Sequence, residues 1–201
     1  MAVEVEIKLS LPDISAAGRI LSDPRVASMI CGNILVCEMD SIYYDTPSRM
    51  LRALEWGLRL RRENGKGVAA LKTKGESSGA MTSRGEWQSE AEDIDSGAAA
   101  LIAVGAPQEL SAALREGLMP VCGVRFTRRH VRLMDGGSVY DLALDSGEFI
   151  GARSERFSEL ELELESGNAD DMRLLADGLA LRFGLVPELR SKLERALLLA
   201  E

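Results

Sequence analysis

Residues 3–9 read Val-Glu-Val-Glu-Ile-Lys-Leu, so charged and aliphatic side chains alternate along this stretch. Because successive side chains of a β-strand point to opposite faces, the stretch predicts a strand with one apolar face and one ionic face. The ionic face would carry Glu4, Glu6 and Lys8. The same alternation returns near the other end of the chain, where residues 159–164 repeat Glu-Leu. These two acidic strands are the basis of the fold prediction.

Basic strands with the same alternation lie between the acidic ones. Residues 58–61 read Leu-Arg-Leu-Arg, residues 70–74 place two lysines on one parity, and Arg84 lies on the parity opposite Trp87. An ordinary antiparallel sheet with a core side and a wet side would give such alternation in any single strand. Here the acidic and basic strands are segregated. This segregation favours a sheet that closes, so that the two sets face each other across a lumen.

The composition is that of a folded, acidic protein. The chain has 201 residues, which suits a single domain over residues 1–201, because chains usually divide only beyond about 250 residues. Hydrophobic residues make up 46% and charged residues 28%, which excludes a disordered chain. The net charge of -8 argues against a nucleic-acid polymer or a membrane surface as partner. An anionic ligand must therefore meet a local concentration of Arg and Lys.

The sequence carries no recognisable targeting signal, and together with the cysteine usage this predicts a cytoplasmic protein. The first residues already form a charged strand, unlike a signal peptide, and no apolar run approaches the roughly 20 residues that span a bilayer. Cys31, Cys37 and Cys122 show no metal-ligand spacing. We expect all three to be buried thiols in a reducing compartment.

The remaining pattern predicts about eight strands, with helices at three places. Further strands are expected at 36–44, 124–134, 138–145 and 149–165, with turns at 63–67 and 146–147 and a polar loop at 75–85. Helices are expected at 15–21, twice within 96–119, from Asn168 to 183, and at 188–200. The natural packing is an α+β fold, a closed or nearly closed eight-stranded antiparallel barrel with helices packed outside. The apolar strand faces would then point outward and the polar faces inward.

An ionic lumen indicates a binding site, because burying charges without a ligand costs several kcal/mol per ion. The basic strands offer planar guanidiniums that bind phosphate oxygens in pairs, and ammoniums that act as point charges. The carboxylates match the same anion poorly unless a hard divalent cation lies between them. The combination predicts a polyphosphate held by basic side chains along one wall and by metal ions on the other.

These motifs resemble those of a known family. Glu4-x-Glu6-x-Lys8 is similar to the ExExK signature of the CYTH superfamily, the triphosphate tunnel metalloenzymes. Further matches follow in family order at residues 43–47, 57–61, 71–74, 84–86, 143–148, 159–164 and 191–192. The ExExK motif alone is weak evidence, because alternating Glu and Lys is common on strands. The resemblance rests on the whole set of motifs and on their order. The chain looks most like the bacterial inorganic triphosphatase branch.

The resemblance implies an eight-stranded tunnel in which Mg²⁺ or Mn²⁺ assists hydrolysis of inorganic triphosphate to pyrophosphate and phosphate. It implies metal ligands at Glu4, Glu6, Glu161 and Glu163. It implies phosphate-binding residues at Lys8, Arg59, Arg61, Lys72 and Lys192, with Arg84 and Arg128 as additions. The implied catalytic residues are Glu4, Glu6, Lys8, Asp145 and Glu159, of which the last two would hold metal-bound water or support the metal ligands.

Several alternatives stay open from the sequence. The strand at 124–132 carries basic residues on both parities, and only the resemblance favours Arg128 and His130 as its lumen-facing pair. Thiamine triphosphatase and class IV adenylyl cyclase activities are rivals within the same fold, because the tunnel would grip a triphosphate whatever is attached to it. A polyphosphate-binding module without catalysis is a third alternative, which the intact carboxylates argue against. The oligomeric state is not indicated.

Overall fold

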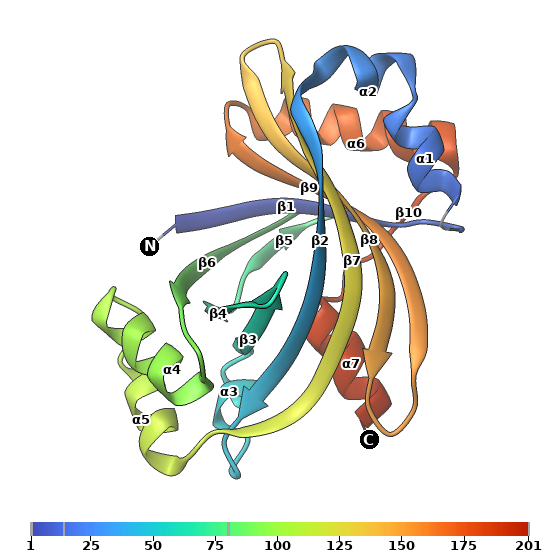
Figure 1. Cartoon of the computed structure of the whole chain (residues 1–201). Coiled ribbons are helices and arrows are strands. Elements are labelled where there is room, and N and C mark those ends of the chain that lie inside the picture. Colours follow the sequence, from blue (N-terminus) through green and yellow to red (C-terminus); the bar gives the residue numbers. More distant parts are fainter. Residues whose placement is uncertain (1, 14, 80, 201) are drawn as a thin grey trace.

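The first strand closes the sheet. In the computed structural model, which describes residues 2–13, 15–79 and 81–200, β1 (Ala2–Ser10) pairs antiparallel with β9 on one edge and with β6 on the other (Figure 1). Within the described chain, eight strands form the closed sheet in the order β1-β9-β8-β7-β2-β3-β4-β6. The predicted eight-stranded antiparallel barrel is therefore confirmed.

The strands differ greatly in length, and two short ones extend the sheet beyond the barrel. The other barrel strands are β2 (Ile30–Asp45), β3 (Gly57–Glu63), β4 (Lys66–Lys72), β6 (Met81–Glu90), β7 (Met119–Asp135), β8 (Ser138–Ile150) and β9 (Glu155–Ser166). β5 (Glu76–Ser78) pairs with β6, and β10 (Val186–Pro187) pairs with β1. The long strands β2 and β7 run side by side over the whole height of the molecule in Figure 1.

Helices cover the outer face of the barrel in two groups. The helices are α1 (Ser15–Leu21), α2 (Pro24–Met29), α3 (Met50–Ala53), α4 (Ile94–Ala103), α5 (Glu109–Glu116), α6 (Ala169–Phe183) and α7 (Lys192–Ala200). The first group, α1, α2 and α6, packs on the aliphatic faces of β1, β7, β8 and β9, and Ile7, Leu142 and Leu162 contribute to that core. The second group, α4 and α5, lies at the left of Figure 1 and covers β3, β4 and β6 around Leu58 and Leu71.

The predicted helix boundaries follow from capping residues. The backbone N–H of Ala16 donates to the Asp13 carboxylate at the start of α1 (3.1 Å). Asn168 accepts a hydrogen bond from the backbone of Asp170, and Gly184 ends α6 in the left-handed conformation that glycine favours. Between them, the two helices expected within 96–119 are confirmed as α4 and α5.

The last helix begins later than expected. It starts at Lys192 rather than at 188, because Ser191 and Glu194 form a capping box. The backbone N–H of Ser191 donates to the Glu194 carboxylate (2.6 Å), and the backbone N–H of Glu194 donates to the Ser191 hydroxyl (3.1 Å). This boundary matters for the lumen, because it places Lys192 in the first turn of α7.

Four other expectations are wrong. The polar loop at 75–85 is instead β5 and the start of β6, whose mostly polar residues show no apolar alternation. The turn at 146–147 is instead continuous strand: a Cβ on Gly147 would lie 2.0 Å from the carbonyl oxygen of Arg125, so glycine permits a close approach of β7. The strand expected at 36–44 starts at Ile30, directly after α2. Only Cys122 is buried, whereas Cys37 is half-buried and Cys31 is exposed.

The inner face of the barrel is not polar throughout. Towards one end, the lumen-facing positions of β7, β8 and β9 carry Phe126, Phe149 and Phe157, and α7 packs on them through Ala196. In Figure 1, α7 lies against the lower ends of β7 and β8, consistent with its contacts to both strands. The ionic part of the lumen is therefore bounded at this end by an apolar helix contact.

None of the helices that the described residues form is long and apolar enough to cross a lipid bilayer.

Candidate functional site

A cavity of about 680 Å³ occupies the barrel lumen. Residues from most of the barrel strands and from α7 line it, and they include eleven of the thirteen predicted site residues: Glu4, Glu6, Lys8, Arg59, Arg61, Lys72, Arg84, Arg128, Glu161, Glu163 and Lys192. The other two, Asp145 and Glu159, are not among the lining residues and are buried beside it. The structure therefore brings the predicted residues together.

Strand register explains why these side chains meet. In an antiparallel pair, residues directly opposite each other project from the same face. Glu6 lies opposite Glu163, Lys8 lies opposite Glu161, and Glu4 lies opposite Arg84 across the pairing that closes the barrel. Each alternating strand therefore delivers its charges to one lumen.

Glu4 and Glu6 lie at the centre of the acidic wall, and both are paired with cations. Arg84 donates from Nε to Glu4 (2.8 Å) and from Nη2 to Glu6 (2.7 Å), while Lys72 donates to the other oxygen of Glu4. Burial raises the pKa of Glu4, but the charges of Lys72 and Arg84 outweigh burial and hold that pKa below its usual value. The ammonium of Lys8 lies 3.7 Å from a carboxylate oxygen of Glu6. In this state Lys72 and Arg84 neutralise the charges of Glu4 and Glu6.

Glu163 is the carboxyl group in this wall that is least compensated. Burial, followed by the like charges of Glu4, Glu86 and Glu6, raises the pKa of Glu163 to about 7. Crowded carboxylates with a raised pKa favour either a proton or a cation between them. Glu4, Glu6 and Glu163, together with Glu161 on the same strand, are hard oxygen donors of the kind that Mg²⁺ and Mn²⁺ prefer, and they therefore fit a divalent cation.

The raised pKa of Glu163 predicts a pH-dependent stability. Between about pH 4.5, the ordinary value for this group, and about pH 7, the folded protein retains a proton that the unfolded chain has lost. Raising the pH through this window therefore lowers the free energy of unfolding. With a chelator present, wild-type protein should lose stability between about pH 4.5 and about pH 7 relative to Glu163→Gln, measured by urea unfolding. Parallel pH profiles of the two proteins would contradict this assignment.

The opposite wall carries Arg59 and Arg61 on β3, each beside one carboxylate, Glu86 and Glu63 respectively. Within the part of the chain that the structure describes, the Nε atoms of Arg59 and Arg61 are buried and have no hydrogen-bond partner. Burial, followed by the charges of Arg59 and Arg128, lowers the pKa of Arg61 to about 10, although Glu63 opposes the shift. A buried donor without an acceptor is costly, and here two of them lie on one wall of a cavity. This wall is therefore short of an anion.

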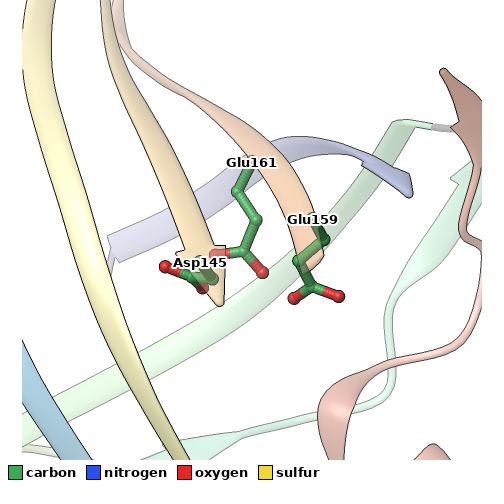
Figure 2. A group of neighbouring side chains, drawn as sticks. All are labelled: Asp145, Glu159 and Glu161. Atoms are coloured by element: carbon green, nitrogen blue, oxygen red, sulfur yellow. The ribbon is translucent and has the colours of Figure 1, made fainter. Parts of the chain in front are cut away.

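A second acidic group lies at the α7 end of the lumen. Asp145 on β8, and Glu159 and Glu161 on β9, bring carboxylate oxygens within 4.8 Å of one another, and Figure 2 shows them reaching into one space. Lys192 fills that space: its ammonium donates to Asp145 (2.8 Å) and to Glu161 (2.9 Å) and is paired with Glu159. A metal ion could enter this group only by displacing the ammonium, just as it would have to displace Lys72 and Arg84 from Glu4 and Glu6.

Arg128 and Arg195 complete this group. Arg128 donates from Nε and Nη2 to the two oxygens of Asp145 (2.8 and 2.7 Å) and from Nη2 to Glu161. Arg195 donates to Glu159. Burial alone would raise the pKa of Glu161, but Lys192 and Arg128 hold it well below its usual value. The group is thus a closed ion network that fixes the two cations lining the cavity, Lys192 and Arg128.

Sequence reasoning missed two members of the site. Glu86 lines the cavity, and its Oε1 lies 3.6 Å from Nζ of Lys72 and 3.9 Å from Nη2 of Arg59. The sequence signal for Glu86 was that it lies on the same strand face as Arg84. Arg195 lies three residues after Lys192 on α7, a spacing that places both on one helix face. Without the tertiary contact to Glu159, nothing in the sequence separates Arg195 from a solvent-exposed residue.

The orientation of β7 agrees with the expectation from the resemblance. Arg128 lies opposite Asp145, and His130 lies opposite Ala143, so both occupy the lumen-facing row. His130 is not among the residues that line the cavity; it contacts Asp141 and Cys37 instead.

Comparison with known proteins gives consistent results. The CYTH domain matches residues 2–196. The inorganic triphosphatase of Haemophilus influenzae is 27% identical over 200 residues, which are 99% of this chain and 53% of that protein. The chain thus spans about half the length of this curated relative.

Solved structures share the fold. A Hippeastrum protein, described as a putative adenylyl cyclase with a dominant triphosphatase activity, superposes with a TM-score of 0.69 at 22% identity and covers 96% of this chain and 94% of its own. A putative adenylate cyclase from Bacillus halodurans superposes with a TM-score of 0.59 at 16% identity, covering 97% and 98%. With the family match extending over nearly all residues, the chain belongs to the CYTH domain family.

Proposed function

We propose that the barrel lumen binds inorganic triphosphate together with a divalent metal ion and hydrolyses it to pyrophosphate and phosphate. The observation that carries the proposal is the pair of buried, partnerless Nε donors on Arg59 and Arg61, beside a wall of carboxylates. A linear chain with several negative charges supplies acceptors for these donors, whereas a single small anion would leave part of the wall unmatched. The Haemophilus inorganic triphosphatase supports the same substrate class.

In this proposal the phosphate chain exchanges partners with the acidic wall. Lys72 and Arg84 now neutralise Glu4 and Glu6, and phosphate oxygens would compete for both cations. Released from these pairs, the carboxylates of Glu4 and Glu6 become available, with Glu161 and Glu163, to hold Mg²⁺ or Mn²⁺. The metal ion, when bound, neutralises phosphate oxygens and lowers the pKa of bound water.

The protein's own contribution is positioning and charge neutralisation, which account for most catalysis in phosphoryl transfer. Four cations on the barrel strands would hold the phosphate oxygens of the substrate: Lys8, Arg59, Arg61 and Lys72. Arg128 and Lys192 would neutralise charge from the α7 end, and Asp145 and Glu159 hold these two cations in place. We therefore assign Asp145 and Glu159 to catalysis through the cations that they position.

A triphosphate that carries an organic group is the second candidate substrate. Trp56 and Tyr44 line the same cavity, and both also pack against the outer cluster around Leu58 and Leu71. Aromatic faces at a tunnel wall can stack on a thiazole, pyrimidine or purine ring. Thiamine triphosphate and ATP are therefore the appropriate competitors for inorganic triphosphate.

The test of the substrate is phosphate release from triphosphate, thiamine triphosphate and ATP, each with Mg²⁺, Mn²⁺ or a chelator. We expect kcat/KM to be highest for inorganic triphosphate and activity to disappear with the chelator. Comparable metal-dependent rates on all three substrates would defeat the inorganic assignment. Binding of triphosphate without turnover under every condition would favour a polyphosphate-binding module.

Removing one guanidinium should chiefly weaken substrate binding. Arg59→Ala is expected to cost about 1.5 to 3 kcal/mol of transition-state stabilisation, or about 10- to 150-fold in kcat/KM, largely through KM. The matched control is Arg62→Ala: Arg62 lies on the opposite face of β3, exposed, and donates to the carbonyl of Glu92 (3.1 Å). An Arg59→Ala enzyme with unchanged kcat and KM would place Arg59 outside the substrate site.

A further inference from the structure

Three side chains outside the cavity lining form a separate cluster on the lumen side of the sheet. Cys37 lies on β2, His130 on β7 and Asp141 on β8, three strands that are neighbours in the barrel. His130 Nε2 lies 3.9 Å from the sulfur of Cys37, and His130 Nδ1 lies 3.1 Å from an oxygen of Asp141. The mechanism above uses none of the three.

This arrangement is that of an activated thiol. The imidazole uses one nitrogen to contact the carboxylate, which orients the ring, and turns the other nitrogen to the thiol. A base in that position can take the thiol proton and leave a thiolate, the nucleophilic form of cysteine. The cluster is also accessible, because Cys37 is half-buried and the side chains of His130 and Asp141 are 27% and 24% exposed.

The other two cysteines lack this environment. Cys31 is exposed, and Cys122 is buried in the apolar cluster under α7, where burial raises its pKa to about 12. Exposure alone would make Cys31 the first thiol to react. The three cysteines therefore give an internal comparison between exposure and activation by a base.

We propose that Cys37 is a modification site of this protein, a thiol activated by His130 and Asp141 that reacts selectively with hydrogen peroxide. The inference goes beyond triphosphate hydrolysis and does not depend on it. In the reaction, His130 Nε2 accepts the thiol proton and the sulfur attacks one peroxide oxygen. The S–O bond forms as the O–O bond breaks, and the departing hydroxide takes the proton from the imidazolium to leave as water. The sulfur is oxidised by two electrons to a sulfenic acid, and the peroxide is reduced.

Oxidation of Cys37 would add an oxygen atom on the lumen side of the sheet. Cys37 lies directly opposite Arg128 in the pairing of β2 with β7, so both project from the same face. An oxygen added to the sulfur therefore lies beside a guanidinium that lines the cavity and is held by Asp145 and Glu161. We expect oxidised protein to hydrolyse triphosphate more slowly, a consequence that rests on the proposed function.

The experiment treats the full chain with dilute hydrogen peroxide at neutral pH, traps sulfenic acid with dimedone, and measures each cysteine by peptide mass spectrometry. We expect Cys37 to be labelled about tenfold faster than the more exposed Cys31. His130→Gln should lower the Cys37 rate to that of Cys31 or below and leave Cys31 unchanged. Cys122 should stay unlabelled in both proteins, which shows that the variant remains folded.

Labelling of Cys37 no faster than Cys31 would overturn the proposal, and so would a Cys37 rate that His130→Gln leaves unchanged. Hydrolysis is measured on the same samples: peroxide should inhibit wild type and Cys31→Ser but not Cys37→Ser, whose untreated activity should equal that of wild type. Inhibition that persists in Cys37→Ser would overturn the link to the lumen. If untreated protein hydrolyses no triphosphate, the proposed function fails. The labelling rates still test whether His130 activates the Cys37 thiol.

Discussion

Replacing Glu4 by glutamine is expected to lower kcat for triphosphate hydrolysis about 100-fold or more, the size of effect seen when one electrostatic element of an active site is removed. Glu4 lies in the acidic wall, accepts hydrogen bonds from Lys72 and Arg84, and is opposite Arg84 in the strand register. Glutamine keeps the shape but removes the charge that a divalent cation requires and leaves only one acceptor oxygen. The loss should therefore be accompanied by a higher metal concentration for half-maximal activity, in assays over a range of Mg²⁺ and Mn²⁺ concentrations.

The matched control for Glu4 is Glu165→Gln. Glu165 follows the glutamate ladder of β9, but it is not among the residues that line the cavity and is paired with Arg132. Its replacement should leave kcat and metal dependence unchanged. A Glu4→Gln enzyme that hydrolyses triphosphate at the wild-type rate would remove Glu4 from the metal site.

Replacing Lys192 by methionine is expected to destabilise the fold by about 3 kcal/mol or more, the usual cost of leaving buried charges without a partner. Lys192 is buried, and its ammonium contacts Asp145, Glu159 and Glu161. Methionine fills most of the volume but supplies no charge, so three carboxylates would share only Arg128 and Arg195. Urea unfolding measures the loss, and α7 should detach from the inner face at lower urea than the remainder of the barrel unfolds.

The control for this second prediction is Lys74→Met, at a lysine that is largely exposed and paired with the exposed Glu55. Surface substitutions of this kind change stability by about 0.5 kcal/mol or less. If the two variants are equally stable, the ion network around Lys192 does not hold α7 in place.

The sequence predicts the barrel and its lumen because both depend on a local pattern. Alternation with period two fixes which side chains share a face, and antiparallel register then aligns those faces, as Glu6 with Glu163 and Lys8 with Glu161 show. Segregation of acidic from basic strands adds the information that the faces meet. Eleven predicted site residues line one cavity as a result.

The parts that could not be predicted depend on contacts between distant segments. Alternation does not reveal that α7 enters the end of the barrel over Phe126 and Phe157, nor that Lys192 fills the carboxylate group there. The role of Gly147 was misjudged because glycine serves close backbone approach as well as turns, and only the neighbouring strand decides between them. The cluster of Cys37 and His130 joins residues 93 positions apart, and no spacing rule connects them.

In the proposed site, the unpartnered donors of Arg59 and Arg61 and the opposing carboxylates together serve metal-dependent triphosphate hydrolysis. The most direct test of this proposal is a single-turnover assay of purified protein with tripolyphosphate, in which phosphate and pyrophosphate are both quantified with Mg²⁺, with Mn²⁺ and with a chelator. We expect one phosphate and one pyrophosphate for each triphosphate consumed with either metal, and no product with the chelator. Products that form equally well with the chelator, or no products with either metal, would contradict it.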